Sequence, residues 1–398
     1  MNQLLKSIVT LATLGLGANA FGQGLVNLNL RPDKDEFARR LPLTVTLDAG
    51  VGYDSNVNQS PDAHGSGYLT GGLAAAYRGG NRRTSYDVSA SYNGFYYLDP
   101  APGQDEYQQS ARAGLNIRHK VNPRMIITDS LYAAYEFEPN YSVGSGTTRR
   151  TDPYFYAYND LSVSYAWGRK FSTVTGYTIS GYDYQTDGHD GENYFSQTIH
   201  QEFRYAITQL TTLALTYRFA TTNYQNDFGD YTSHYILAGV DHSFSRRMFG
   251  TIRAGAEIRN RDNGGNETNP YAEGSLTYRS DKDTSFGLYG RYGLEDSSVG
   301  SYQDRSSFRV GVTAQRRLTD RLTGSLGLHY VLDQYDNSAG QLDNSYDDNV
   351  FSVSAGLIYE LYKNFSLTTQ YSFTTDSSGN PLKDYDRQNV SMALRYTW

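Results

Sequence analysis

From Leu43 to the C-terminus, the chain alternates apolar and polar residues in runs of about a dozen. In one such run, Leu326 and Leu328 lie on the face opposite His329. This period-2 alternation is typical of a β-strand that has one apolar face. A chain that keeps the pattern over nearly its whole length is predicted to be built from strands.

Two kinds of connection separate the runs, and they alternate along the chain. Eight are tight turns, at 79–81, 121–123, 168–169, 208–209, 246–247, 281–283, 319–320 and 363–364. Nine are longer polar loops, at 54–65, 98–106, 138–153, 185–192, 225–230, 262–268, 296–302, 336–346 and 376–384. Seventeen connections predict eighteen strands.

The tight turns recur about every 40 residues, a spacing that also fits a β-propeller blade. A blade places four short strands in that length, whereas each period here holds two long ones. Long strands with alternating short and long connections are typical of a transmembrane barrel, which must close because lipid cannot bond a sheet edge. We therefore predict an all-β, antiparallel, up-and-down transmembrane β-barrel of about 18 strands over residues 43–398. Since a membrane strand needs about 9–11 residues, these strands should extend beyond the bilayer.

The composition agrees with a barrel and excludes other classes. The chain has no cysteine, which excludes disulfides, thiolate metal sites and cysteine nucleophiles. A net charge of −7 argues against a nucleic-acid partner. A mean hydropathy of −0.61 fits a barrel with a water-filled lumen, because such a barrel needs no globular apolar core.

The N-terminus has the parts of a secretory signal peptide at residues 1–20. Lys6 provides the positive charge, Ile8–Leu16 is a short apolar run, and Ala18 to Ala20 form a cleavage site. Residues 21–42 are charged and are expected to form a periplasmic lead segment. Together with the predicted barrel, these features predict that the protein is located in the outer membrane of a Gram-negative bacterium.

Aromatic residues near the connections predict two membrane-interface girdles. Those near the tight turns are Trp167, Phe171, Phe249, Phe286, Tyr362, Phe365 and Trp398. Those near the longer loops are Tyr96, Tyr107, Tyr154, Tyr184, Tyr224, Tyr231, Tyr302 and Tyr335.

The chain stops on an aromatic residue inside its last strand. Trp398 follows Val390, Met392, Leu394 and Tyr396, which share one strand face. This resembles the terminal strand by which Gram-negative outer-membrane proteins are recognised for assembly. The resemblance implies that Tyr396 and Trp398 form a signal read by the barrel-assembly machinery.

The first predicted strand ends in Gly-Tyr-Asp-Ser-Asn-Val at 52–57, within the longer segment 48–61. This segment resembles the opening of an outer-membrane porin family whose members are described beside exopolysaccharide loci. The resemblance implies an outer-membrane channel, one that could pass saccharides, and it brings no catalytic residues.

If the apolar faces meet lipid, the opposite faces line the lumen. The predicted pore-lining residues are Arg112, Arg118, Arg204, Arg218, Arg253, Arg259, Arg291, Arg309, Arg395, Asp160, Glu202 and Glu257, beside Asp48 and Glu360. Arginine outnumbers lysine 28 to 7, and its planar fork suits carboxylates on neighbouring strands. Two interpretations stay open, namely ion pairs that stiffen the wall and a path for anionic sugars or other anions.

Signs of enzyme chemistry are weak. Seven histidines are scattered without metal-ligand spacing, and no nucleophile elbow, P-loop or dinucleotide motif is present. We predict no catalytic residues, no cofactor and no metal site, and therefore no enzyme. Acidic clusters at 187–192 and 343–348 are either solvated loops or Ca²⁺ ligands.

The leading functional hypothesis is a porin that passes small solutes or saccharides through a polar, arginine-lined lumen. Two alternatives are an outer-membrane component of exopolysaccharide export and a structural or adhesive surface barrel. The expected partners are outer-membrane lipid, the barrel-assembly machinery and a saccharide, anionic or neutral.

Overall fold

The computed structural model describes residues 43–137, 153–185, 193–225, 229–262, 265–280, 284–296, 304–335, 346–379 and 384–398. The predicted signal peptide and lead segment at 1–42 lie outside these residues. Among the described residues there is no helix that is long and apolar enough to cross a membrane.

The described residues form eighteen strands. The first nine are β1 (Leu43–Asp54), β2 (Ser66–Gly80), β3 (Thr84–Tyr97), β4 (Tyr107–Asn122), β5 (Met125–Glu136), β6 (Tyr154–Ala166), β7 (Phe171–Tyr184), β8 (Tyr194–Ala206) and β9 (Thr211–Tyr224). The others are β10 (Tyr231–Ser243), β11 (Met248–Arg261), β12 (Asn266–Ser280), β13 (Thr284–Asp296), β14 (Asp304–Arg317), β15 (Leu322–Tyr335), β16 (Tyr346–Tyr362), β17 (Phe365–Ser378) and β18 (Tyr385–Thr397).

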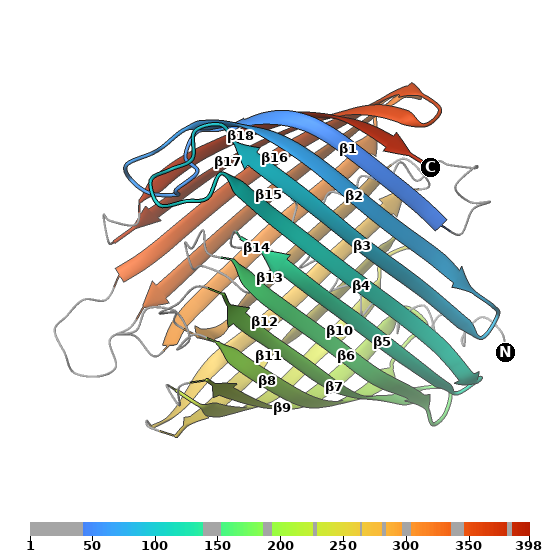
Figure 1. Ribbon diagram of the computed structural model, residues 1–398. Coiled ribbons are helices and arrows are strands. Elements are labelled where there is room, and N and C mark those ends of the chain that lie inside the picture. Colours follow the sequence, from blue (N-terminus) through green and yellow to red (C-terminus); the bar gives the residue numbers. More distant parts are fainter. Residues whose placement is uncertain are drawn as a thin grey trace.

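Each strand pairs antiparallel with the next, and β18 pairs with β1, so the sheet closes on itself (Figure 1). The closing pair runs from Thr46 opposite Thr397 to Asp54 opposite Asn389. The prediction of an eighteen-stranded, all-β, up-and-down barrel is confirmed for the described residues. The tight turns gather at one end of the barrel and the longer connections at the other (Figure 1).

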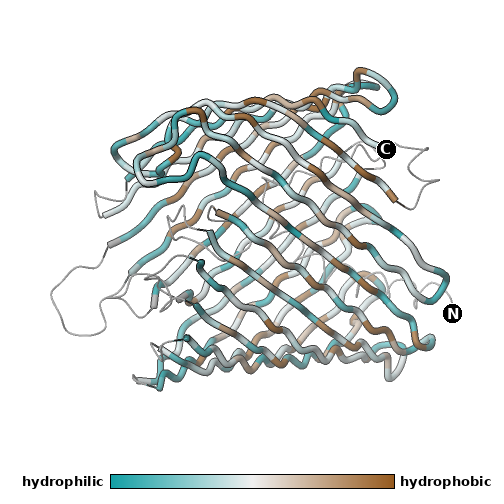
Figure 2. The backbone as a smooth tube through the Cα atoms, in the orientation of Figure 1, coloured by the Kyte–Doolittle hydropathy of each residue, from teal (hydrophilic) through white to brown (hydrophobic). Residues whose placement is uncertain are grey.

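The alternation in the sequence sorts side chains between the two faces of the wall. On β9, Leu213 and Leu215 are 43% and 53% exposed and point outward, whereas Ala214 and Thr216 are buried on the inner face. Hydrophobic and hydrophilic positions therefore alternate along most strands (Figure 2). The barrel thus has an apolar exterior and a polar interior.

Two predicted loops are shorter in the structure than the sequence suggested. β12 already begins at Asn266 and β17 continues to Ser378, so parts of 262–268 and 376–384 are strand. The polar residues there were interpreted as loop. These residues form strands nonetheless. The part of the barrel wall that extends beyond the apolar, lipid-facing band meets water, so it needs no apolar face.

The prediction of two girdles is wrong for several aromatic residues. Residues such as Trp167, Tyr362 and Trp398 are exposed at the tight-turn end, as expected. The buried exceptions, all at inward-facing positions, are Tyr154, Tyr184, Tyr231, Phe249 and Tyr335. Nearness to a connection does not decide which face a side chain takes, since that depends on its odd or even place in the strand.

Candidate functional site: the inner wall of the barrel

All twelve predicted pore-lining residues stand at inward-facing strand positions. β11 illustrates the cause, because Ile252 is 57% exposed on the outside while the neighbouring Arg253 is 7% exposed on the inside. Glu257 and Arg259 follow at the same parity and are also buried. That solutes pass along these side chains stays a prediction.

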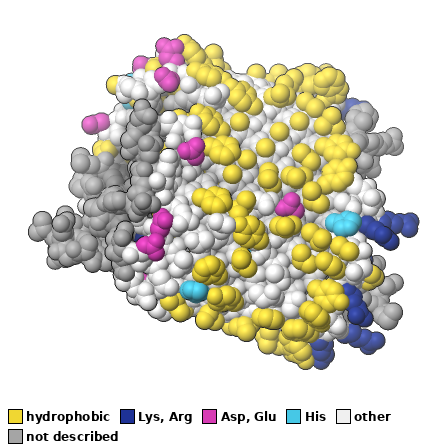
Figure 3. Space-filling model, turned by 60° about the horizontal axis from the view of Figure 1, so that its bottom comes forward, with side chains coloured by type: hydrophobic (Ala, Val, Ile, Leu, Met, Phe, Trp, Pro, Cys, Tyr) yellow, Lys and Arg dark blue, Asp and Glu magenta, His cyan; other side chains and the backbone are white. Residues whose placement is uncertain are grey.

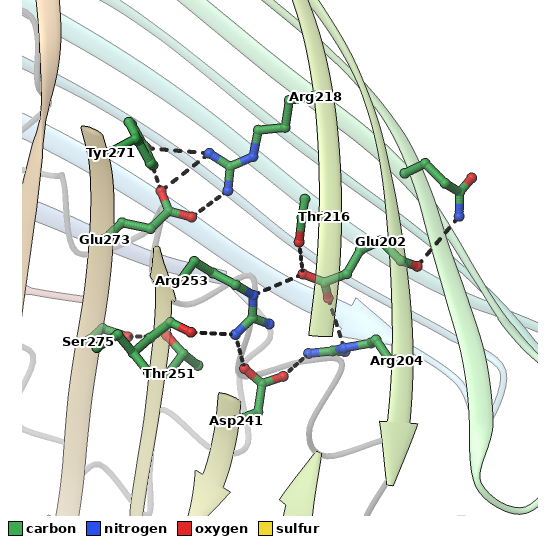
Figure 4. Close-up of polar contacts among 12 residues, drawn as sticks. Glu202, Arg204, Thr216, Arg218, Asp241, Thr251, Arg253, Tyr271, Glu273 and Ser275 are labelled. Carbon is green, nitrogen blue, oxygen red and sulfur yellow. Dashed lines mark hydrogen bonds and ion pairs between the residues drawn. The ribbon is translucent and has the colours of Figure 1, made fainter. Parts of the chain in front are cut away.

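Three of the predicted residues, together with Asp241, form the most extensive group of ionic contacts drawn in Figure 4. Glu202 forms an ion pair with Arg204 at 2.8 Å and accepts a hydrogen bond from Arg253 at 3.1 Å. Asp241, fully buried on β10, pairs with Arg204 and, at 2.7 Å, with Arg253. Thr216 donates a further bond to Glu202 at 2.9 Å. Glu202, Arg204, Asp241 and Arg253 thus form a closed ring of alternating charge, which we call the ion-pair ring.

A second group lies beside the ring and reaches across β9 to β12. Arg218 bonds both carboxylate oxygens of Glu273, and Tyr271 donates to the same carboxylate at 2.6 Å. The guanidinium groups of Arg218 and Arg291 lie 5.8 Å and 5.7 Å from the Tyr271 ring centre, within the range of a cation–π contact. Arg218 and Glu273 keep 26% and 31% of their side-chain surface exposed, and Arg291 keeps 39%. These three are therefore more exposed than the members of the ion-pair ring, whose arginines keep less than 10% of their side-chain surface exposed.

The remaining predicted residues fall into smaller groups. Glu295 pairs with Arg291 at 3.2 Å and with Arg309 at 3.6 Å. Arg259 pairs with Glu257 at 2.9 Å. Most of the inward arginines are thus neutralised by carboxylates of the wall.

The other four predicted residues lie outside these groups. Arg112 pairs with Glu136, and Asp160 accepts a bond from Thr178 at 2.6 Å. Within the described part of the chain, buried Nε atoms of Arg118 and Arg395 have no hydrogen-bond partner. The structure therefore brings most, but not all, of the predicted residues into ionic contact.

A cluster of inward tyrosines was missed in the sequence. Tyr154, Tyr156, Tyr182 and Tyr184 are buried together on β6 and β7. The rings of Tyr156 and Tyr182 lie 4.7 Å apart, and Tyr154 donates to Glu136 at 2.8 Å. All four residues have even numbers, and residues two apart in a strand share one face. This spacing is the signal in the sequence from which the cluster could have been predicted. The wall therefore has a tyrosine sector on β6 and β7 beside an arginine–carboxylate sector that begins at β8.

The Gly-Tyr-Asp-Ser-Asn-Val motif at 52–57 holds the first and last strands together. The fully buried Asp54 accepts two bonds from Nε of Arg387, at 3.0 Å and 2.9 Å, and one from Asn389 at 3.0 Å. Asn56 bonds the carbonyl of Asp386 at 3.1 Å, and Ser55 bonds the backbone of β18. These contacts, which we call the seam clasp, give the motif a structural role that its sequence alone did not reveal.

Gly239 on β10 provides the space that the ion-pair ring needs. A methyl group at this position would overlap the side chain of Arg253 and the carbonyl oxygen of Ile252. We expect Gly239→Ala to lower the free energy of unfolding by about 1–3 kcal/mol, because an overpacked site forces its neighbours to shift. Urea unfolding in lipid vesicles measures the change. Gly71→Ala is the matched control, because its added methyl would meet only a carbonyl oxygen at 3.8 Å. Equal stability of the two variants would contradict the close packing around Arg253.

Metal ligands do not gather in the described part of the chain, where no three histidine or acidic side chains could hold an ion together. The acidic cluster at 187–192 lies outside the described residues, and so do residues 343–345 of the cluster at 343–348. Calcium binding there stays untested.

The chain matches several solved structures, and one of these proteins, OpdK of Pseudomonas aeruginosa, is described as an outer membrane protein. OccAB4 of Acinetobacter baumannii is 14% identical, with a TM-score of 0.41 over 89% of this chain and 97% of that protein. OpdK of Pseudomonas aeruginosa, solved with vanillate, is 11% identical, with a TM-score of 0.45 over 89% and 99%. OccK8 (OprE) of Pseudomonas aeruginosa is 13% identical, with a TM-score of 0.40 over 90% and 98%. No curated protein sequence matches the chain.

The family described as "Putative beta-barrel porin 2" matches residues 307–397, from within β14 to the end of β18. The match supports the porin resemblance predicted from 52–57, although it lies at the other end of the sequence. The two segments are neighbours in space, because β1 pairs with β18. Over its last five strands, the chain is therefore similar to a family of β-barrel porins.

Proposed function

We propose that the protein is an outer-membrane porin that passes small polar solutes, saccharides among them, through an arginine-lined lumen. The observation that carries the proposal is a closed wall with opposite chemistry on its two faces. Outward positions such as Leu215 and Ile252 are apolar, whereas inward positions hold arginines and carboxylates. Barrels of about 16–18 strands are wide enough to leave an aqueous channel.

The exposure of the inward ionic groups supports a solvent-filled lumen. Arg218, Glu273 and Arg291 point inward from the middle parts of their strands, yet each keeps a quarter or more of its side chain exposed. Side chains of a packed interior would lose that exposure. Guanidinium, carboxylate and phenol groups together offer donors and acceptors to a solute rich in hydroxyl groups.

The balance of charge in the wall supports weak ion selectivity. Because the arginines of the ion-pair ring are matched by carboxylates, the ring adds no net charge to the lumen. We therefore expect the purified full chain to form a conducting channel in a planar bilayer, with only a small reversal potential in a salt gradient. A folded protein that does not conduct, with or without residues 21–42, would contradict the proposal.

Arg291 should influence this selectivity more than the paired arginines Arg204, Arg218, Arg253, Arg259 and Arg309, because its side chain is more exposed than theirs. We expect Arg291→Ser to shift the reversal potential toward cations, since Glu273 and Glu295 remain in the lumen. Arg316→Ser is the matched control, because Arg316 is exposed at an outward-facing position at the end of β14. The same shift in both variants would show that the lumen position of Arg291 does not determine selectivity.

A further inference from the structure

The two ends of the barrel carry opposite charge (Figure 3). At the tight-turn end, the exposed cations of the turns and the adjoining strand ends include Arg82, Arg83, Arg124, Arg169, Lys170, Arg246, Arg247, Arg279, Arg316, Arg321 and Lys363. In the described part of those same turns, Asp320 is the acidic residue. At the other end, the exposed charged side chains that the structure describes are acidic: Asp62, Asp99, Asp105, Glu106, Asp183, Asp262, Asp347 and Asp386.

One stretch of the basic end combines cations with exposed aromatic rings, and we call it the aromatic–basic patch. It consists of Trp167, Arg169, Lys170, Phe171, Phe203 and Tyr205, from the turn between β6 and β7 and the adjacent end of β8. Its four aromatic side chains are 40–61% exposed. The rings of Phe171 and Phe203 are nearly parallel, with centres 6.5 Å apart.

The Lys170 ammonium lies on the outer side of the wall, because it stands 5.9 Å from the ring centre of the outward-facing Tyr205. A cation that served solutes in the lumen would point to the inner side instead. The charge therefore lies on the same outer surface as the exposed rings of Phe171, Phe203 and Tyr205.

The backbone of the patch is held in place by hydrogen bonds. The amides of Trp167 and Gly168 donate to the carbonyl of Phe171 at 3.1 Å and 3.2 Å. The amide of Ala206 donates to the carbonyl of Lys170 at 2.8 Å, which ties the turn to β8. The Trp167 indole donates to Thr173 at 3.0 Å. These bonds fix the backbone of the turn and its position beside the end of β8.

We propose that the aromatic–basic patch binds an anionic phospholipid of the adjoining leaflet. Arg169 and Lys170 would meet the phosphate, and Phe171 and Phe203 would contact the acyl chains. Aromatic and basic residues are both enriched at membrane interfaces, and each Lys or Arg near an anionic surface strengthens the attraction. The inference rests on the membrane location in the proposed function, and it adds a lipid site at the basic end of the barrel.

Native mass spectrometry of the full chain in detergent tests the proposal, with phosphatidylglycerol and phosphatidylcholine as probes. We expect the wild type to retain phosphatidylglycerol in preference to phosphatidylcholine. The Arg169→Gln/Lys170→Gln variant should bind phosphatidylglycerol roughly tenfold more weakly. Arg82→Gln/Arg83→Gln is the matched control, because it removes the same charge from another turn of the same end, and it should retain most of the binding.

Three results would overturn the proposal. They are equal binding of the two lipids, an equal loss in both double variants, and full displacement of the lipid by inorganic phosphate. Full displacement by inorganic phosphate would mean that the aromatic surface takes no part in lipid binding. Full displacement by a soluble polyanion such as dextran sulfate would have the same meaning. Conductance in a neutral bilayer should be unchanged in Arg169→Gln/Lys170→Gln. Loss of lipid binding with intact conductance therefore separates this inference from the proposed function.

Discussion

Replacing Asp54 with alanine is expected to lower the free energy of unfolding of the barrel by about 3–5 kcal/mol, because it leaves a largely buried arginine without its counter-charge. The Arg387 side chain is 14% exposed and that of Asp54 is fully buried, so water cannot replace the lost carboxylate. The same change also removes the bonds from Asn389 and from the backbone amide of Asn56.

The position of Asp54 makes this loss more serious than a similar loss elsewhere in the wall. Seventeen of the strand pairs join neighbours in sequence, whereas β1 and β18 are brought together only when the sheet closes. A weakened seam clasp should therefore slow closure as well as favour opening. We expect slower folding into lipid vesicles in addition to lower stability.

The temperature at which the folded band disappears, on a gel of samples heated to a series of temperatures before loading, measures the stability. Stopped-flow fluorescence measures the rate of folding. Asp386→Ala is the matched control, because Asp386 is an exposed acid on β18 whose backbone, not its side chain, bonds Asn56. Asp54→Asn should fall between the two, since an amide keeps one acceptor but not the charge. An Asp54→Ala barrel as stable as the Asp386→Ala control would contradict the role of the seam clasp.

The sequence predicts the faces of this barrel well, because alternation carries that information directly. The parity of Arg253 and Ile252 alone places one inside and the other outside. For the same reason the strand number could be counted from the connections. The aromatic girdles were partly wrong because Tyr154 and Tyr231 were assigned by their distance from a loop, which does not fix parity.

Partners across strands could not be predicted in the same way. Arg204 and Asp241 are 37 residues apart in sequence, and they meet only because the register of three strands brings them to one height. A single sequence contains no direct signal of that register. The seam clasp was out of reach for the same reason, since Asp54 and Arg387 are 333 residues apart.

The second large effect is expected at the ion-pair ring. Asp241→Ala leaves Arg204 and Arg253 to share Glu202, so one positive charge stays unmatched. The side chains of both arginines are less than 10% exposed, so water cannot compensate for the missing carboxylate. We expect the free energy of unfolding to fall by about 3–5 kcal/mol. Urea unfolding in vesicles, followed by tryptophan fluorescence, measures it.

A double variant distinguishes an unmatched charge from the loss of a stabilising contact. Arg204→Met with Asp241→Leu removes one cation and one anion and leaves Glu202 paired with Arg253 at 3.1 Å. Because a buried ion pair replaced by apolar groups of similar size is often neutral, this variant should recover most of the stability that Asp241→Ala loses. If it were less stable than Asp241→Ala, the ring would be stabilising through its contacts and not merely through its balance of charge. In that case the inner wall would depend on its arginines for stability as well as for the properties of the lumen.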